Sequence, residues 1–246
     1  AIKSARMVAG RHKILVRYRA YHGATAGAIT LTGDPRRWAA EPGIPGVVRI
    51  PDFYPYRAGK QLEDPEYAAS VLSATEDIIQ FEGPHTIAAM IIETVVGTNG
   101  ILIPSGAYLR GLRELCTKYG ILLIADEVMS GFGRTGEWFA VDHWGVVPDM
   151  MTLAKGLTSA YVPLGATMVT DTIAEYFEDH PLYAGLTYNA HSVGCAAGVA
   201  CVNIYKEDKL IENARAMGEI LKAELAKLKD KHPSVGDTRA IGLFSI

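Results

Sequence analysis

Short apolar runs alternate with longer segments of helical periodicity along this chain. The runs predict five strands: Ile14–Arg17, Ala88–Ile92, Leu122–Ala125, Met150–Leu153 and Ala166–Val169. Uninterrupted apolar strands separated by helix-length segments are typical of a mostly parallel sheet with helices on both faces. We therefore predict an α/β fold with three layers.

Two helices and one irregular segment stand out between and after these runs. Residues Ser105–Tyr119 carry apolar side chains at helical spacing and end at Gly120, a plausible C-cap. Apolar residues recur every three or four positions over Lys209–Lys231, and His232-Pro233 follows. The segment Gly33–Gly59 is rich in Pro and Gly and predicts a long surface excursion.

Composition narrows the class of protein. The chain has 246 residues, of which 49% are hydrophobic, so it can bury a core. The three cysteines form no CxxC pair, which favours a reducing compartment and hence a cytoplasmic location. No apolar run reaches the length of a membrane span.

Charge gives no general reason to expect a nucleic-acid partner. Lys plus Arg number 24 against 27 Asp plus Glu, a formal net charge of -3. Residues 1–33 are an exception, because they hold six basic side chains and no acid. Without an aromatic ladder beside them, we interpret these basic residues as a solvated helix face or a subunit contact.

Chemistry-bearing residues follow three of the predicted strands. Glu93 follows Ala88–Ile92, Asp126-Glu127 follows Leu122–Ala125, and Lys155 comes shortly after Met150–Leu153. The carboxyl ends of parallel strands open onto the ligand crevice of an α/β sheet. Acids and a lysine could thus converge there, the alternative being that strand ends simply turn polar on reaching solvent.

A glycine-rich segment raises a rival hypothesis. Residues Gly131–Gly136, with the sequence GFGRTG, fit the GxGxxG pattern of NAD-binding oxidoreductases. Four residues separate Asp126 from the first glycine, and Glu137–Ala140 shows no helix start that would hold a pyrophosphate. The context therefore argues against a dinucleotide site. The seven histidines show no HExxH or paired spacing, so no metal site is predicted.

Four ordered motifs together resemble the class III aminotransferases, which are pyridoxal-phosphate (PLP) enzymes of fold type I. Ile124–Val128 with the glycine-rich segment resembles the family signature, and Tyr21-His22-Gly23 resembles its aromatic turn. Thr152–Gly156 resembles the segment of its Schiff-base lysine. Thr187-Tyr188 with His191 resembles its late phosphate-contact segment. The resemblance covers essentially the whole chain and implies the large domain of that fold.

The resemblance implies two catalytic residues, and their chemistry suits those roles. Lys155 would hold the aldehyde of PLP and later carry a proton, because a lysine beside an apolar wall loses its proton more easily than one in water. Asp126 would keep the pyridine nitrogen protonated, since a buried carboxylate favours that charged form.

The same resemblance implies the residues that surround the cofactor ring. Tyr21, in the turn with His22 and Gly23, would stack on one side of the ring, and Val128 would pack on the other. Met129 stands where many relatives have Gln, so it offers the ring hydroxyl only a weak contact.

Two further residues complete the cofactor set by resemblance. Glu93 matches a glutamate at the floor of the site, with a structural ion pair as the alternative role. Thr187 resembles a threonine that reaches the cofactor phosphate of the partner subunit. The resemblance therefore implies a homodimer, or a dimer of dimers, with shared active sites.

The ends of the chain predict an internal fragment of a longer protein. It opens at Ala1 inside a helical pattern and closes on the apolar stretch Gly242–Ile246. We expect residues 1–237 to form a large domain that lacks its N-terminal part, and residues 238–246 to begin a truncated small domain. The main phosphate-binding turn would precede Ala1, so we expect the fragment by itself to be inactive.

The substrate is the property that the sequence indicates least clearly. Residues 31–38, Glu82–His85 and Glu93-Thr94 look most like the type that moves an amino group from an ω-amino acid or taurine to pyruvate. Two alternatives stay open, an aminomutase of the glutamate-1-semialdehyde type and a fragment that serves only in folding or dimerisation.

Overall fold

Six strands form one sheet in the spatial order β2-β1-β3-β4-β5-β6. The computed structural model describes residues 1–246, and these strands are β1 (Lys13–Arg17), β2 (Val47–Ile50), β3 (Ile87–Glu93), β4 (Leu122–Asp126), β5 (Met150–Leu153) and β6 (Ala166–Val169). Every neighbouring pair is parallel except β5 and β6. The prediction of a mostly parallel sheet is confirmed, and each predicted strand agrees with its observed counterpart to within one residue at either end.

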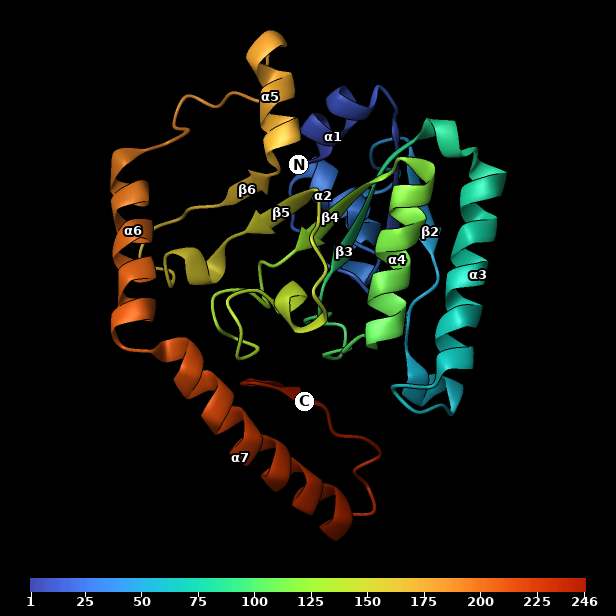
Figure 1. Cartoon of the computed structure of the whole chain (residues 1–246), viewed down its shortest axis with the longest axis vertical. Helices are drawn as coiled ribbons and strands as arrows, with labels where there is room; N and C mark the ends of the chain where they lie inside the picture. The colour runs from blue at the N-terminus through green and yellow to red at the C-terminus, as the bar shows by residue number, and fades with distance from the viewer.

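Helices cover both faces of this sheet (Figure 1). They are α1 (Ile2–Ala9), α2 (Ala26–Leu31), α3 (Pro65–Glu82), α4 (Gly106–Tyr119), α5 (Asp171–Asp179), α6 (Ser192–Glu207) and α7 (Leu210–Lys231). Leu15 and Met90 pack with α3 and α4, whereas their strand neighbours Ile14 and Ile91 pack with α1, α2 and α5. Because successive strand residues point to opposite faces, one sheet supplies two cores and three layers result. None of the helices combines the length and apolar content that crossing a membrane requires.

Helix ends follow the signals in the sequence. The Ser105 hydroxyl accepts a hydrogen bond from the Tyr108 N–H at 3.2 Å and caps the start of α4. Gly120 ends the same helix in the left-handed conformation, with a φ of 60°. The long predicted helix is α7, which stops at His232.

The interpretation of Gly33–Gly59 as a surface excursion is wrong in part. The segment contains β2, which pairs in parallel with β1, and both Ile50 and Phe53 are buried. Strand β2 has only four residues between Gly46 and Pro51, so it is too short to show a periodicity. Its pairing with β1 is non-local and could not be read from that segment alone.

Several of the basic residues near the N-terminus bind groups within the chain, whereas Lys3 is exposed. Arg11 Nη1 donates to four backbone carbonyls, among them Gly120 O at 2.9 Å and Tyr119 O at 3.2 Å at the end of α4. Lys13 forms an ion pair with Glu82 at 2.8 Å, and Arg17 is buried and donates to the backbone oxygen of Glu93. These cations hold loops and helix ends in place, where unpaired carbonyls gather.

Candidate active site

Three strand ends meet at one edge of the sheet. In the register of β3 with β4, Glu93 lies opposite Asp126, and in that of β4 with β5, Asp126 lies opposite Thr152. Lys155 follows three residues after Thr152 and begins a short 3₁₀ helix, η5 (Lys155–Leu157). The pairing therefore brings the two acids and the strand that carries the lysine into one row, as parallel strand ends should.

Asp126 has a defined set of partners. Its side chain is 6% exposed, Oδ1 accepts the Val128 N–H at 3.1 Å, and Oδ2 lies 2.7 Å from His22 Nδ1. With its proton on Nδ1, His22 donates to Asp126 and orients the carboxylate. No lysine or arginine pairs with Asp126, so this buried carboxylate can still bind a cationic N–H. The contact between His22 and Asp126 has no signal in the sequence, because 104 positions separate the two residues.

The Glu93 carboxylate accepts hydrogen bonds from two loops and forms no ion pair. Its Oε1 accepts the Tyr21 N–H at 2.9 Å and its Oε2 accepts the Gly97 N–H at 2.8 Å. Arg17 donates to the backbone oxygen of Glu93, not to its carboxylate. Burial raises the pKa of Glu93 above its ordinary value. Within this chain Glu93 forms no ion pair, and it ties the Tyr21 turn to the loop after β3.

The side chains that the motifs place around the cofactor ring lie close to Asp126 and Glu93 in the chain fold, and they are partly exposed. Tyr21, Val128 and Met129 are half-buried. A Cβ at Gly97 would lie 2.3 Å from the Met129 sulfur, so the methionine packs directly on that glycine. Gly23 has a φ of 125°, which lets the chain turn after His22.

Lys155 is exposed and held in an uncommon backbone conformation. Its φ is 41°, in the left-handed region that costs an L-residue about 1–3 kcal/mol. Its amine has no hydrogen bond or ion pair in the chain. Behind it, a Cβ at Gly156 would come within 2.8 Å of the Phe132 Cβ, so the turn packs closely on the glycine-rich segment. The exposed Lys209 shares this backbone conformation, with a φ of 52°, so Lys155 is set apart by its place after β5 and not by its φ.

Thr187 does not join this group within one chain. It lies in the irregular segment 180–191 between α5 and α6, and it is exposed like nearly all of its neighbours. The site residues implied by the motifs are thus gathered at the sheet edge, except Thr187.

Glu127 is a further buried acid, and the structure gives it a structural role. It is fully buried; Oε2 accepts from the Ser130 hydroxyl and from Ala140 N at 3.0 Å, and Oε1 accepts Val141 N at 3.0 Å. Strand alternation could have indicated this, because Glu127 points away from the face that Asp126 uses. Glu127 therefore anchors the glycine-rich segment to the 3₁₀ helix η4 (Ala140–Trp144).

Replacing Glu127 by Gln should lower the free energy of unfolding. The amide nitrogen would face backbone N–H groups that now meet an acceptor, which costs about 2 kcal/mol. Burial raises the pKa of Glu127, so the folded state keeps this proton to higher pH than the unfolded chain does. The stability from Glu127 is then largest at low pH and falls as the pH rises through its raised pKa.

The wild-type advantage over Glu127→Gln should accordingly shrink as the pH rises, which urea unfolding from about pH 4 to about pH 8 measures. Glu219→Gln, at an exposed position of α7, is the matched control. An advantage that grows with pH would contradict the assignment.

The glycines of the GFGRTG segment serve packing against α7. A Cβ at Gly133 would lie 2.4 Å from the Ile211 Cδ1, and one at Gly136 would lie 3.2 Å from the Arg215 Cα. Both glycines have positive φ, 85° and 89°. The segment leads into η4 and not into an α-helix. Its glycine pattern is thus explained by a close helix approach and by tight turns.

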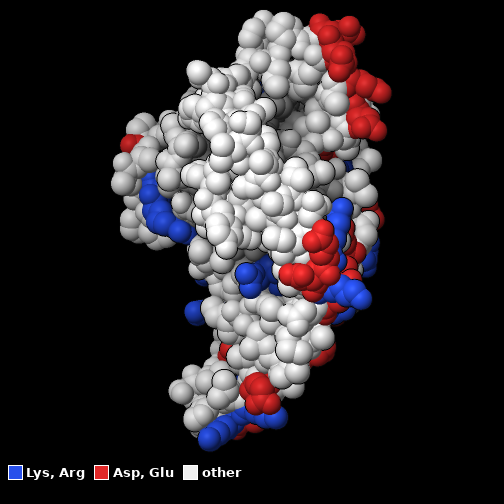
Figure 2. All heavy atoms as spheres, turned by 90° about the vertical axis from the view of Figure 1, so that its left-hand side faces the viewer, with Lys and Arg blue, Asp and Glu red and all other residues white.

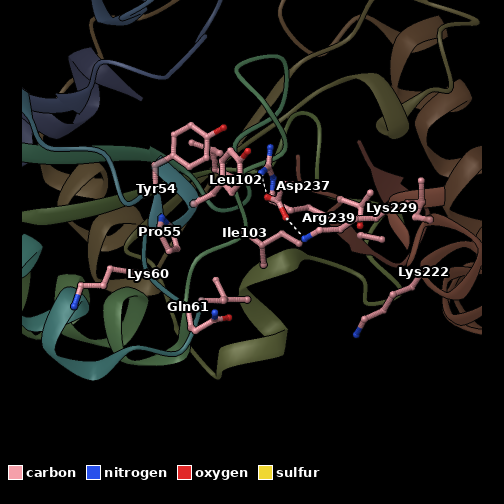
Figure 3. Close-up of a pocket in the computed structure, with 15 residues that line it drawn as sticks. Tyr54, Pro55, Lys60, Gln61, Leu102, Ile103, Lys222, Lys229, Asp237 and Arg239 are labelled. Atoms are coloured by element: carbon pink, nitrogen blue, oxygen red, sulfur yellow. Dashed lines mark hydrogen bonds and ion pairs between the residues drawn. The ribbon is translucent and has the colours of Figure 1, made fainter. Parts of the chain in front are cut away.

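A cavity of about 360 Å³ lies apart from the strand ends (Figure 3). Its walls come from the Tyr54–Leu62 segment, from α7 and from residues 237–240 near the start of the small hairpin β7 (Ala240–Ile241) and β8 (Phe244–Ser245). Lys60, Lys222, Lys229 and Arg239 line it, and Asp237 pairs with Arg239. None of the strand-end residues borders this cavity, so we place the candidate active site at the sheet edge, where the chemistry-bearing side chains gather.

The fold and the row of strand-end residues define a class of protein. The chain matches the aminotransferase class-III family over residues 1–246 and belongs to that family. The resemblance seen in its four motifs is thereby confirmed.

Particular relatives refine this picture. The chain is 36% identical over 255 residues to the hypotaurine/taurine–pyruvate aminotransferase of Paracoccus denitrificans, covering 98% of this chain and 55% of the relative. It is 37% identical over 237 residues to the putrescine–pyruvate aminotransferase of Pseudomonas aeruginosa, covering 94% and 51%.

Solved structures agree. The taurine:2-oxoglutarate aminotransferase of Bifidobacterium kashiwanohense, in complex with PLP and glutamate, superposes with a TM-score of 0.97 at 48% identity, covering 99% of this chain and 56% of that one. The chain thus spans about half the length of the relatives it matches.

Proposed function

We propose that the whole protein transfers the amino group of an ω-amino acid, taurine or a similar amine to a keto acid, with pyruvate as the favoured acceptor. The observation that carries the proposal is the buried Asp126 carboxylate, which has no cationic partner and lies one strand away from the turn of Lys155. Membership of the class III family and the relatives that use taurine, putrescine and pyruvate support the reaction class.

The donor set at the sheet edge fits pyridoxal phosphate. Asp126 can bind a protonated ring nitrogen, the unpaired amine of Lys155 can bind an aldehyde, and Tyr21 offers an aromatic face. When bound, PLP supplies an aldehyde that accepts amines and a ring that stabilises negative charge on the neighbouring carbon.

The residues of this chain would then divide the work. Asp126, oriented by His22, holds the ring proton in place, and Lys155 moves a proton to and from the substrate carbon. Glu93 fixes the position of Tyr21 through the Tyr21 N–H. Tyr21 and Val128 orient the ring between them.

Turnover of the full-length protein tests this function. Taurine, β-alanine and putrescine are each supplied with pyruvate, and alanine formation is measured. Borohydride reduction of the protein with PLP, followed by peptide mapping, should label Lys155. Absence of alanine with every donor, or a label on another lysine, would overturn the proposal.

The surface around Thr187 supports a homodimer in which subunits share sites. Residues 180–205 contain no Asp, Glu, Lys or Arg. Ten of the 21 exposed large apolar side chains lie in residues 161–204: Tyr161, Met168, Val169, Leu182, Tyr183, Leu186, Tyr188, Val193, Val199 and Ile204. Figure 2 views the side that carries α6 and shows a broad uncharged surface with charges at its margins. An apolar surface of this kind marks a protein interface.

Mixing inactive subunits should restore activity if Thr187 completes the partner's site. In a heterodimer of Lys155→Ala and Thr187→Ala subunits, one composite site carries both changes and the other carries none. Statistical exchange should then return about a quarter of wild-type activity, because half of the dimers have one intact site. Thr172→Ala, at an exposed threonine of α5, should be active by itself. Full activity of Thr187→Ala alone, or no recovery despite proven exchange, would refute the shared site.

A further inference from the structure

The guanidinium of Arg36 lies over the ring of Tyr21. Its guanidinium carbon is 3.8 Å from the ring centroid, the closest of the cation and ring contacts in the chain. Arg36 belongs to the 3₁₀ helix η1 (Pro35–Ala40), which follows α2. Tyr21 is the side chain proposed to hold the cofactor ring, so Arg36 borders the candidate active site.

The position of Arg36 is set by neighbours from two loops. Its Nε donates to both carboxylate oxygens of Asp34 at 3.0 Å, and its Nη2 donates to Asp34 and, at 2.8 Å, to the Thr98 hydroxyl. Asn99 Nδ2 donates to Asp34 at 3.0 Å. The bonds from Arg36 hold the pKa of Asp34 at about 2, so this carboxylate stays charged. Arg36 is therefore a fixed group rather than a freely moving surface side chain.

The backbone before Arg36 is fixed as well. A Cβ at Gly33 would lie 2.0 Å from the Tyr18 carbonyl oxygen, so the chain passes directly over the end of β1. The Gly33 N–H donates to Ala20 O at 2.9 Å. These contacts tie η1 to the turn that carries Tyr21.

One edge of Arg36 has no partner. Nε and Nη2 make all of its hydrogen bonds, and Nη1 donates none. The side chain is 46% exposed, whereas Asp34 is 7% exposed. The two N–H groups of Nη1 thus remain free to donate from a held guanidinium beside Tyr21, an arrangement that suits the oxygens of a carboxylate or sulfonate.

We propose that Arg36 binds the anionic end of the amine substrate and selects ω-amino acids and aminosulfonates over amines that lack an anionic group. This inference rests on the proposed aminotransferase function. An ω-amino acid carries its anionic group at the end opposite the reacting amine, so its binding group should lie at the margin of the site. Glu93 and Asp126 would repel an anion, and Arg17 is buried and bonded to Glu93 O. Arg36 is the cation at this margin that remains accessible.

Donor selectivity of the full-length enzyme tests the inference. Taurine and n-butylamine are compared as donors to pyruvate in wild type, Arg36→Leu and Arg36→Lys. For taurine, kcat/KM of Arg36→Leu should fall about ten- to hundredfold, chiefly through KM, because a hydrogen bond to a charged group is lost. For butylamine it should change by less than about threefold. For taurine, kcat/KM of Arg36→Lys should lie between those of wild type and Arg36→Leu, because lysine keeps the positive charge but lacks the paired N–H donors of the guanidinium.

A binding measurement separates this inference from the proposed function. Calorimetric titration with ethanesulfonate, which has no amine, should show binding to wild type and at least about tenfold weaker binding to Arg36→Leu. The control is Arg57→Leu, at an exposed arginine of the 3₁₀ helix η2 (Pro55–Ala58), which should leave both readouts unchanged. Thermal unfolding checks that each variant is folded.

The outcomes are distinguishable. If wild type transfers no amino group from any donor, the proposed function fails, and the calorimetric result still decides whether Arg36 binds anions. If kcat/KM falls by the same factor for taurine and for butylamine in Arg36→Leu and Arg36→Lys, or falls for neither donor, Arg36 does not select the substrate. Equal ethanesulfonate binding by wild type and both variants would also overturn the inference.

Discussion

Asp126→Asn should lower turnover of the full-length enzyme by about two to four powers of ten. The amide keeps the shape of the side chain and removes the negative charge proposed to hold the proton of the ring nitrogen. Losing a positioned charge of this kind raises the barrier by about 3–5 kcal/mol, and each 1.36 kcal/mol is tenfold in rate. Single-turnover measurement of the amine half-reaction reports this loss directly.

The structure sharpens the expectation for Asp126. Because His22 Nδ1 and the Val128 N–H already bind the carboxylate, the amide must turn one NH₂ group toward a donor or lose a bond. Cofactor titration followed by absorbance should show that Asp126→Asn still binds PLP. Asp77→Asn, at an exposed position of α3, is the matched control and should retain full turnover. Turnover within about threefold of wild type would mean that another acid performs this role.

Lys155→Ala should abolish measurable transamination, with a loss of at least about three powers of ten. The change removes the amine proposed to hold the cofactor and to move the proton, and positioned proton transfer alone contributes about 10²–10⁴. Lys155→Ala should also lose the borohydride label. It should remain folded, because the Lys155 side chain is exposed and unpaired and its replacement leaves no buried group without a partner.

Lys118→Ala is the control for the lysine. Lys118 pairs with Glu76 at 2.7 Å on the surface of α4, with its side chain 61% exposed, so its loss should leave activity unchanged. A surface ion pair contributes only about 0–1 kcal/mol, and the variant should fold normally. If Lys118→Ala lost activity and Lys155→Ala kept it, the assignment of the reactive lysine would be wrong.

Local patterns were enough to predict the parts of the fold that depend on near neighbours in the chain. The central strands bury both faces, so β3 to β5 appear as apolar runs with clear bounds. Helix α4 carries its own capping residues at both ends. The segment before Pro51 lacked any such signal, since β2 exists only through its pairing with β1.

Site chemistry divides in the same way. Asp126 and Lys155 were predicted as site residues because each stands at or shortly after the end of a strand within a distinctive motif, and parallel topology carries both strand ends to one edge. The residues that contact them could not be predicted from the sequence. The bond from His22 to Asp126, the hold of Glu93 on the Tyr21 turn and the position of Arg36 over Tyr21 join residues that different loops deliver.

The sequence by itself determined the α/β class, five strands of the main sheet, the helices α4 and α7, the aminotransferase family and the identity of the strand-end residues, because these follow from periodicity and short motifs. Only the tertiary structure decided which acid faces the site, what the glycine-rich segment packs against and which arginine keeps free N–H groups beside Tyr21. Asp126 and Glu127 are adjacent in the chain, yet one binds His22 and the other binds the backbone of η4. The physical reason is that burial, hydrogen-bond partners and side-chain direction depend on groups brought together across the sheet, and their spacing in the chain does not encode them.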